Sequence, residues 1–150
     1  MLLEDEIKQT KFKSDYNKLA VNIIYTHGWL INKHNEILKK FDVTPAQYNI
    51  LRILRGQYPN PAPILLLKDR MLDKMSDASR LVERLRTKGL IDRKICNEDR
   101  RKVNVLITKK GLQLLSQIDE YDSEFEGFLK NLDISEAKEA NILLDKLRGC

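Results

Sequence analysis

One apolar stripe constrains the fold of this chain more than any other feature. Its members are Phe12, Tyr16, Leu19, Ile23, His27, Leu30, His34, Ile37 and Phe41. The mean step between them is about 3.6 residues, which is the period of an α-helix. The stripe predicts one long helix, with a local bend or a close neighbour at Gly28, because glycine weakens a helix. One small domain cannot cover a helix of this length, so we expect a second chain to cover part of it.

Composition excludes several classes of protein. The chain has 150 residues, which fits one domain, and 42% of them are hydrophobic, enough to bury a core. Six Gly and four Pro are few for this length and favour helix. The longest aliphatic run, residues 64–67, is far shorter than a membrane-spanning helix, and the acidic first residues do not resemble a signal peptide. We expect a soluble cytoplasmic protein that contacts no membrane.

A start signal follows the stripe. Thr44 offers an N-cap hydroxyl and Pro45 suits the first helical position, so a helix should begin there. It should run to about Arg55, because a turn rich in proline over residues 59–63 follows.

Two helices joined by a tight turn come next. The first is a short helix over residues 64–72, and the turn takes up residues 73–75. Ser76 should cap the second helix, which ends at Gly89. The basic residues of that second helix are Arg80, Arg84, Arg86 and Lys88. This arrangement is the outline of a helix-turn-helix.

Two alternating segments then predict a β-hairpin. The residues that share a face in each strand are Ile91, Arg93 and Ile95, then Val103, Val105 and Ile107. The loop between them, residues 97–102, is polar and ends in three bases. A helix-turn-helix followed by a hairpin with a basic tip is a winged helix, which can place a helix in the major groove of DNA and an arginine in the minor groove.

The C-terminal part is predicted to be helical. Thr108 should cap a helix whose apolar residues recur every three or four positions to about Leu132. A last helix over about residues 135–147 should bury one face, formed by Ala140, Leu143, Leu144 and Leu147.

Charge is distributed unevenly. The net charge is +5, but residues 64–110 hold 14 Lys and Arg against 7 Asp and Glu, whereas residues 111–150 hold 4 against 9. A basic segment beside an acidic one indicates a module that binds a polyanion next to a segment with another role. Charge alone leaves open a basic face that is merely solvated.

Five short stretches match the pattern of a known family. They are Leu51-Arg52-Ile53-Leu54, Ser79-Arg80-Leu81-Val82-Glu83-Arg84-Leu85, Lys88-Gly89-Leu90-Ile91-Asp92-Arg93, Asp99-Arg100-Arg101 and Ile107-Thr108-Lys109-Lys110-Gly111. With these stretches in this order, the chain resembles the MarR family of bacterial transcription regulators. The resemblance implies a mainly α fold with a small β-hairpin (α+β), in which residues 41–110 form a winged helix-turn-helix and residues 1–40 and 111–150 form dimerisation helices.

The same resemblance implies a function. A homodimer would bind double-stranded DNA at a pseudopalindromic operator, as a repressor by the habit of the family. The recognition helix would offer DNA the residues Ser76, Asp77, Ser79, Arg80, Arg84 and Arg86. Arg84 could instead brace the wing, and Asp77 could read cytosine or only cap the helix.

The wing adds a second set of candidates. Asp99 matches the family residue that orients the arginine entering the minor groove, here Arg101, whereas Arg100 and Lys102 should meet the DNA backbone. Cys96 lies beside these bases, which could lower the pKa of its thiol, so it is a candidate thiol sensor. The alternative is an inert strand cysteine.

Many relatives bind a small amphipathic molecule or an oxidant between their dimerisation and DNA-binding parts. The candidates for such an effector pocket are Tyr16, Tyr25, His27, Trp29, His34 and Tyr48. A stripe of this kind is also common in a core or a dimer interface, and that alternative stays open.

Other functions find little support in the residues. The glycines are scattered, no catalytic triad or pair of carboxylates is recognisable, and His27, His34, Cys96 and Cys150 lie too far apart for a metal site. We therefore expect neither an enzyme nor a cofactor. The main alternative is a winged helix that contacts another protein and binds no specific DNA sequence.

Overall fold

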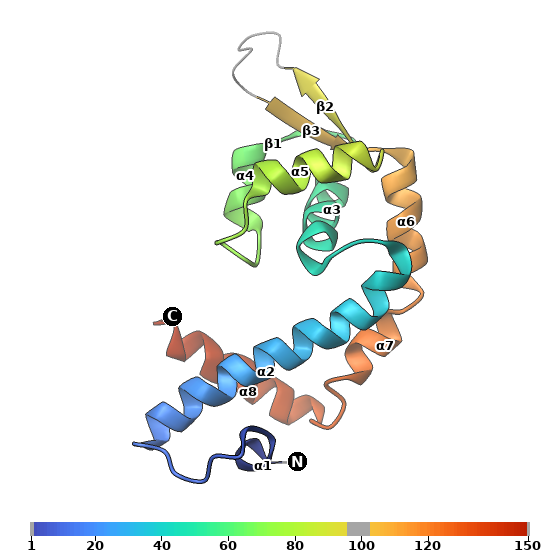
Figure 1. Ribbon diagram of the computed structural model, residues 1–150. Helices are drawn as coiled ribbons and strands as arrows, with labels where there is room; N and C mark the ends of the chain where they lie inside the picture. Colours follow the sequence, from blue (N-terminus) through green and yellow to red (C-terminus); the bar gives the residue numbers. More distant parts are fainter. Residues whose placement is uncertain (1, 96–102, 150) are drawn as a thin grey trace. The chain divides into compact units, whose positions relative to one another are not determined.

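The computed structural model describes residues 2–95 and 103–149 (Figure 1). The chain divides into two compact units, Met1–Pro45 and Ala46–Cys150. Within the part that the structure describes, no helix is both long enough and apolar enough to span a bilayer.

The first unit contains the long helix that the stripe predicts. Helix α2 (Asp15–Leu38) begins after Ser14, whose hydroxyl accepts a hydrogen bond from the Asn17 amide at 3.1 Å. Its end tightens into the 3₁₀ turn η1 (Lys39–Phe41), so the predicted helix is correct in place but shorter at both ends. Of the local bend or close neighbour expected at Gly28, a close neighbour is absent from the described chain, since a Cβ there would meet no described atom within 4 Å, and the bend stays a prediction.

A short helix that was not predicted, α1 (Leu3–Ile7), lies beside α2. Two polar contacts join them: the Lys18 ammonium pairs with the Glu4 carboxylate, and the Tyr25 hydroxyl donates to Glu6 Oε2 at 2.8 Å. The pair with Lys18 lowers the pKa of Glu4.

The second unit begins with the predicted helix α3 (Pro45–Gln57), which continues two residues beyond Arg55 and buries Ile50, Leu51 and Leu54. The proline-rich segment that follows is more than the predicted turn. Residues Ala62–Pro63 form strand β1, which pairs with a later strand. Proline has no N–H to donate to a neighbouring strand, so it is tolerated chiefly at a sheet edge, which is where β1 lies.

Helix α4 (Ile64–Arg70) and helix α5 (Ala78–Thr87) form the predicted helix-turn-helix. Leu67 of α4 and Met71, the residue that follows this helix, are both buried. Two details of the prediction are wrong: the connection spans residues 71–77 rather than three residues, and the residue that caps α5 is Asp77, not Ser76.

The hairpin strands β2 (Ile91–Ile95) and β3 (Val103–Ile107) are confirmed. They pair antiparallel with Ile91 opposite Ile107 and Arg93 opposite Val105, in a three-stranded sheet of order β1-β3-β2. Ile91, Val105 and Ile107 are buried, so one face of the sheet belongs to the core, and the sheet contacts α4 and α5.

The C-terminal helices differ from the prediction. Thr108 caps helix α6 (Lys109–Asp119) as expected, but the single helix predicted to about Leu132 is interrupted, and a separate helix α7 (Asp122–Gly127) follows. Asp119, at the end of α6, pairs with both terminal nitrogens of Arg55 on α3, at 2.7 and 3.1 Å.

Helix α8 (Ile134–Leu147) starts at a capping box formed by Asp133 and Glu136. The apolar face predicted to be buried is not buried in this chain. Leu143 is 57% exposed, Leu144 40% and Leu147 55%, and Ala140 is only partly covered. The pattern therefore marks a face that needs a partner rather than a core of this chain.

Candidate nucleic-acid interface

The turn before α5 is organised by one carboxylate. Asp73 accepts hydrogen bonds from the Met75 amide at 2.9 Å and from the Ser76 hydroxyl at 2.5 Å. At the start of the turn, the Leu72 amide donates to Asn49 Oδ1 on α3 at 3.0 Å. Ser76 therefore belongs to the turn and not to the recognition helix, which corrects the prediction.

The first turn of α5 is capped and exposed. Asp77 accepts a hydrogen bond from the Arg80 amide at 3.1 Å, so of its two suggested roles the structure provides the cap. Ser79 and Arg80 are exposed beside it. A helix N-terminus carries partial positive charge and unpaired amides, which suits a phosphate of DNA.

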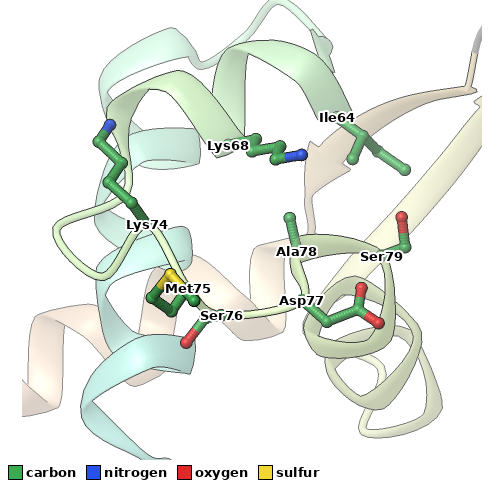
Figure 2. Close-up of a pocket in the computed structure, with 8 residues that line it drawn as sticks. All are labelled: Ile64, Lys68, Lys74, Met75, Ser76, Asp77, Ala78 and Ser79. Atoms are coloured by element: carbon green, nitrogen blue, oxygen red, sulfur yellow. The ribbon is translucent and has the colours of Figure 1, made fainter.

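A hollow of about 280 Å³ opens beside this helix start (Figure 2). Its lining residues come from α4, the turn and α5: Ile64, Lys68, Lys74, Met75, Ser76, Asp77, Ala78 and Ser79. The Lys74 ammonium donates to the main-chain oxygen of Asp69. The charged groups of this lining are therefore the two lysines and the Asp77 carboxylate that caps α5, with an excess of positive charge.

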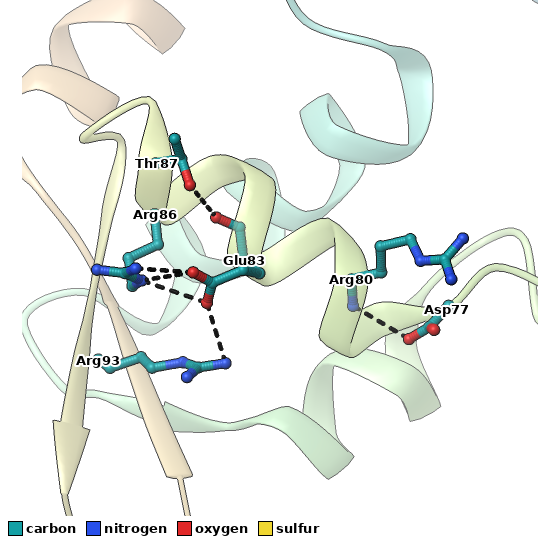
Figure 3. Close-up of polar contacts among 6 residues, drawn as sticks. All are labelled: Asp77, Arg80, Glu83, Arg86, Thr87 and Arg93. Atoms are coloured by element: carbon teal, nitrogen blue, oxygen red, sulfur yellow. Dashed lines mark hydrogen bonds and ion pairs between the residues drawn. The ribbon is translucent and has the colours of Figure 1, made fainter.

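Further along α5, Glu83 connects the helix to the sheet (Figure 3). Its carboxylate accepts from Arg86 at 2.7 and 3.1 Å and pairs with Arg93 of β2 at 3.2 Å. The hydrogen bond from Arg86, with the nearby charge of Arg93, holds the pKa of Glu83 below its usual value, and the pKa of Arg86 is raised by the same contact.

This contact changes the interpretation of one candidate. Arg86, expected to meet DNA, is held by Glu83 on the side of α5 that faces β2 (Figure 3). By contrast, the guanidinium groups of Arg80 and Arg84 are exposed, and neither has a hydrogen bond or ion pair within residues 2–95 and 103–149. Sequence analysis missed Glu83, although its place three residues before an arginine is a signal for such a pair.

The end of α5 is fixed to the start of α6. Gly89 has a φ of 72° and forms a Schellman motif, in which its amide donates to Arg86 at 2.8 Å and the Leu90 amide donates to Leu85 at 3.1 Å. The Thr108 hydroxyl donates to the Gly89 carbonyl at 2.8 Å, and Lys110 Nζ to the Lys88 carbonyl at 2.8 Å. These contacts join two of the stretches that matched the family pattern, Lys88-Gly89-Leu90 and Thr108-Lys109-Lys110-Gly111.

Several candidates lie outside the described residues. These are the wing residues Asp99, Arg100, Arg101 and Lys102, and the thiol of Cys96. Their roles stay predictions.

The effector candidates are divided between the two units. Tyr16, Tyr25, His27, Trp29 and His34 lie on α2, where Tyr16 is 86% exposed and burial lowers the pKa of His34. Tyr48 lies on α3, with its ring stacked on that of Phe125 at 6.1 Å and the Arg52 guanidinium 5.7 Å away. The effector pocket stays a prediction. In the described part of the chain, no group of His, Cys, Asp and Glu could hold a metal.

Comparison with known proteins gives the family. The family model for "MarR family" matches residues 43–103, which include α3, α4, α5 and β2. The HTH-type transcriptional regulator YpoP of Bacillus subtilis is 36% identical over 106 residues, covering 68% of this chain and 69% of the relative. The chain belongs to the MarR family. It is therefore a DNA-binding transcription regulator. Membership of the family favours DNA binding over the alternative of a winged helix that only contacts another protein.

Two further comparisons agree. The transcriptional repressor IacR of Pseudomonas putida is 28% identical over 120 residues, which cover 79% of this chain and 71% of the relative. A crystal structure of a MarR mutant from E. coli, complexed with operator DNA, superimposes with a TM-score of 0.80 at 24% identity over 92% of this chain and 99% of that chain. The second likeness concerns the fold, and it confirms the winged helix flanked by further helices.

Proposed function

We propose that this chain is a homodimeric repressor that recognises a pseudopalindromic operator with two copies of helix α5. One observation carries the proposal: the outer face of α5 presents Arg80 and Arg84, exposed and, among the described residues, without a partner. An arginine that forms no ion pair within its own chain is available to bind a phosphate or a guanine. The relative IacR is itself named a repressor, which supports this direction of regulation.

Each candidate on α5, and each of the two that precede it, receives a role. Ser79 and Arg80 contact bases or the nearby phosphate, and Arg84 contacts phosphate. Asp77 keeps the helix start in place as its cap, and Ser76 acts through the turn that it closes with Asp73. Arg86 remains paired with Glu83, where it helps to hold the helix against strand β2 of the wing.

The wing takes the part that the family resemblance implies. Asp99 orients Arg101 toward the minor groove, and Arg100 and Lys102 meet the backbone. Because Glu83 joins α5 to β2 through Arg93, the recognition helix and the first strand of the wing would approach DNA as one body.

Dimerisation supplies the second recognition helix. The residues that support it are apolar and exposed in the single chain: Leu143, Leu144 and Leu147 of α8, and Leu19 and Ile24 of α2. Burial of such side chains against a second copy is favourable at about 25 cal/mol for each Å² of apolar surface. The dimerisation region would then be residues 1–40 and 111–150, with residues 41–110 binding DNA.

Two finer parts of the proposal concern regulation and location. A small amphipathic or aromatic effector would bind near the aromatic and histidine side chains of α2 and shift the dimer to a state with another spacing of its recognition helices. A cytoplasmic regulator without catalytic activity or cofactor accords with the family. Cys96 would act as a thiol sensor only if alkylation of its sulfur changes operator affinity.

Selection of bound duplexes from a random pool, followed by sequencing, tests the proposal. We expect a site with two inverted half-sites about one helical turn apart, or a multiple of that. Affinity should fall with salt, with log K decreasing by about 0.9 per log unit for each phosphate contacted. Failure to enrich any sequence, or enrichment of an asymmetric single site, would contradict it.

A further inference from the structure

One apolar side chain stands out on the surface that the proposed function assigns to DNA. Met75 is 93% exposed, although it lies in the turn that leads into the recognition helix. It lines the same hollow as Lys68 and Ser79 (Figure 2). Single exposed apolar side chains are common on protein surfaces, but this one lies beside the start of the helix that the proposed function places on DNA.

The turn that carries Met75 is well fixed. Its own amide is held by Asp73 at 2.9 Å, and the same carboxylate holds the next residue, Ser76, at 2.5 Å. The preceding residue, Lys74, is tied to the end of α4 through the main-chain oxygen of Asp69. The backbone under Met75 therefore has a defined position relative to α5, and only the side chain is left to adapt.

The chemistry of the major groove limits what such a side chain can contact. The base edges there present hydrogen-bond donors and acceptors, and the one large apolar group is the C5-methyl of thymine. A methionine side chain is unbranched and polarisable, and it fits irregular apolar surfaces well. Among the charged residues that line the hollow, Lys68 and Lys74 are cationic and Asp77 is anionic. The remaining positive charge favours DNA over an apolar protein partner at this surface.

We propose that Met75 reads the methyl group of a thymine in each operator half-site. This inference rests on the proposed function and adds a specificity-determining residue to it. Met75 covers the thymine methyl while Ser79 and Arg80, on the adjoining helix turn, make the polar contacts.

Replacement of single thymines by deoxyuridine in the selected operator tests the proposal, because it removes only the methyl group. Burial of one methyl-sized group contributes about fourfold to affinity. When the thymine that Met75 contacts is replaced in both half-sites, we therefore expect the wild-type dimer to lose about fifteenfold in affinity. The variant Met75→Ala should bind the thymine and deoxyuridine duplexes equally, whereas Met75→Leu should keep most of the difference.

A matched control is available in the same turn. Leu72 is 87% exposed but does not line the hollow, so Leu72→Ala should preserve the preference for thymine. The inference is overturned if every deoxyuridine duplex binds the wild type as well as the parent duplex, or if Met75→Ala keeps the preference. Either result leaves binding of the unmodified operator intact, and so differs from a failure of the proposed function, in which no operator is bound.

Discussion

At the scale of single residues, the tightest constraint is at Gly111. A Cβ built there would lie 2.4 Å from the Leu90 carbonyl oxygen and 2.7 Å from Cγ1 of Ile107. Both neighbours belong to rigid parts of the fold, since Leu90 follows the capped end of α5 and Ile107 is buried in β3. Only glycine allows the start of α6 to approach this closely.

Gly111→Ala should therefore lower the free energy of unfolding by about 1–3 kcal/mol, the usual cost of overpacking. Chemical denaturation of the purified variant measures it. Gly56→Ala is the matched control, because Gly56 lies within α3 and its added Cβ would meet nothing within 4 Å. The control should gain up to about 1 kcal/mol from helix propensity. Equal stability of Gly111→Ala and wild type would show that the contact is wrong.

At the scale of elements, Glu83 ties the recognition helix to the wing strand β2 through Arg86 and Arg93. Its pKa is lowered in the folded chain, chiefly by the hydrogen bond from Arg86. A carboxyl group whose pKa is depressed by folding adds stability above its unfolded pKa, and that stability is lost as the pH falls through the folded pKa.

Glu83→Gln should consequently be less stable than wild type near pH 7, and the difference should shrink as the pH falls below the ordinary value of 4.5. Denaturation at a series of pH values measures this difference. Glu124→Gln, at an exposed position of α7 with no ion pair in the described chain, should change the stability near pH 7 by less than Glu83→Gln does. A difference between Glu83→Gln and wild type that is independent of pH would contradict the assigned ion pairs.

The elements also show how far sequence patterns reach. Periodicity predicted α2, and cap and stop residues predicted the starts of α3 and α6 and the end of α5, because these signals are local. Strand β1 escaped prediction since two residues carry no period and depend on pairing with β3. The prediction of Ser76 as the cap is wrong because its hydroxyl donates to Asp73, and Asp77 caps the helix instead. Residue spacing alone did not reveal this contact. The role of Arg86 follows from Glu83, three residues earlier on the same helix, and that local signal was overlooked. Only the pair between Glu83 and Arg93 depends on a neighbour across the fold.

At the scale of the whole molecule, the apolar residues left in water indicate that the chain is half of an assembly. Leu143 and Leu147 of α8 are each more than half exposed. The buried face that apolar periodicity predicted on α8 is wrong for the single chain, because the single chain does not provide a surface that buries it. In our proposal, a second copy of the chain provides that surface.

Leu143→Glu should weaken the dimer, because it would place a charge in the apolar contact. Sedimentation equilibrium should show monomer for this variant at concentrations where wild type is dimeric. Lys138→Glu changes the charge at an exposed polar position of the same helix and should leave the dimer intact. A wild-type chain that sediments as a monomer, or a Leu143→Glu variant that remains dimeric, would remove the basis for two-fold operator recognition.

The central claim is that the outer face of α5 binds operator DNA, and one titration tests it most directly. Fluorescence anisotropy with the selected duplex compares wild type with Arg80→Ala/Arg84→Ala and with Arg52→Ala, which removes an exposed arginine of α3. We predict that the double variant loses about tenfold or more in affinity and shows a shallower dependence on salt, whereas Arg52→Ala binds nearly as wild type. Equal affinity and equal salt dependence for all three proteins would contradict the account.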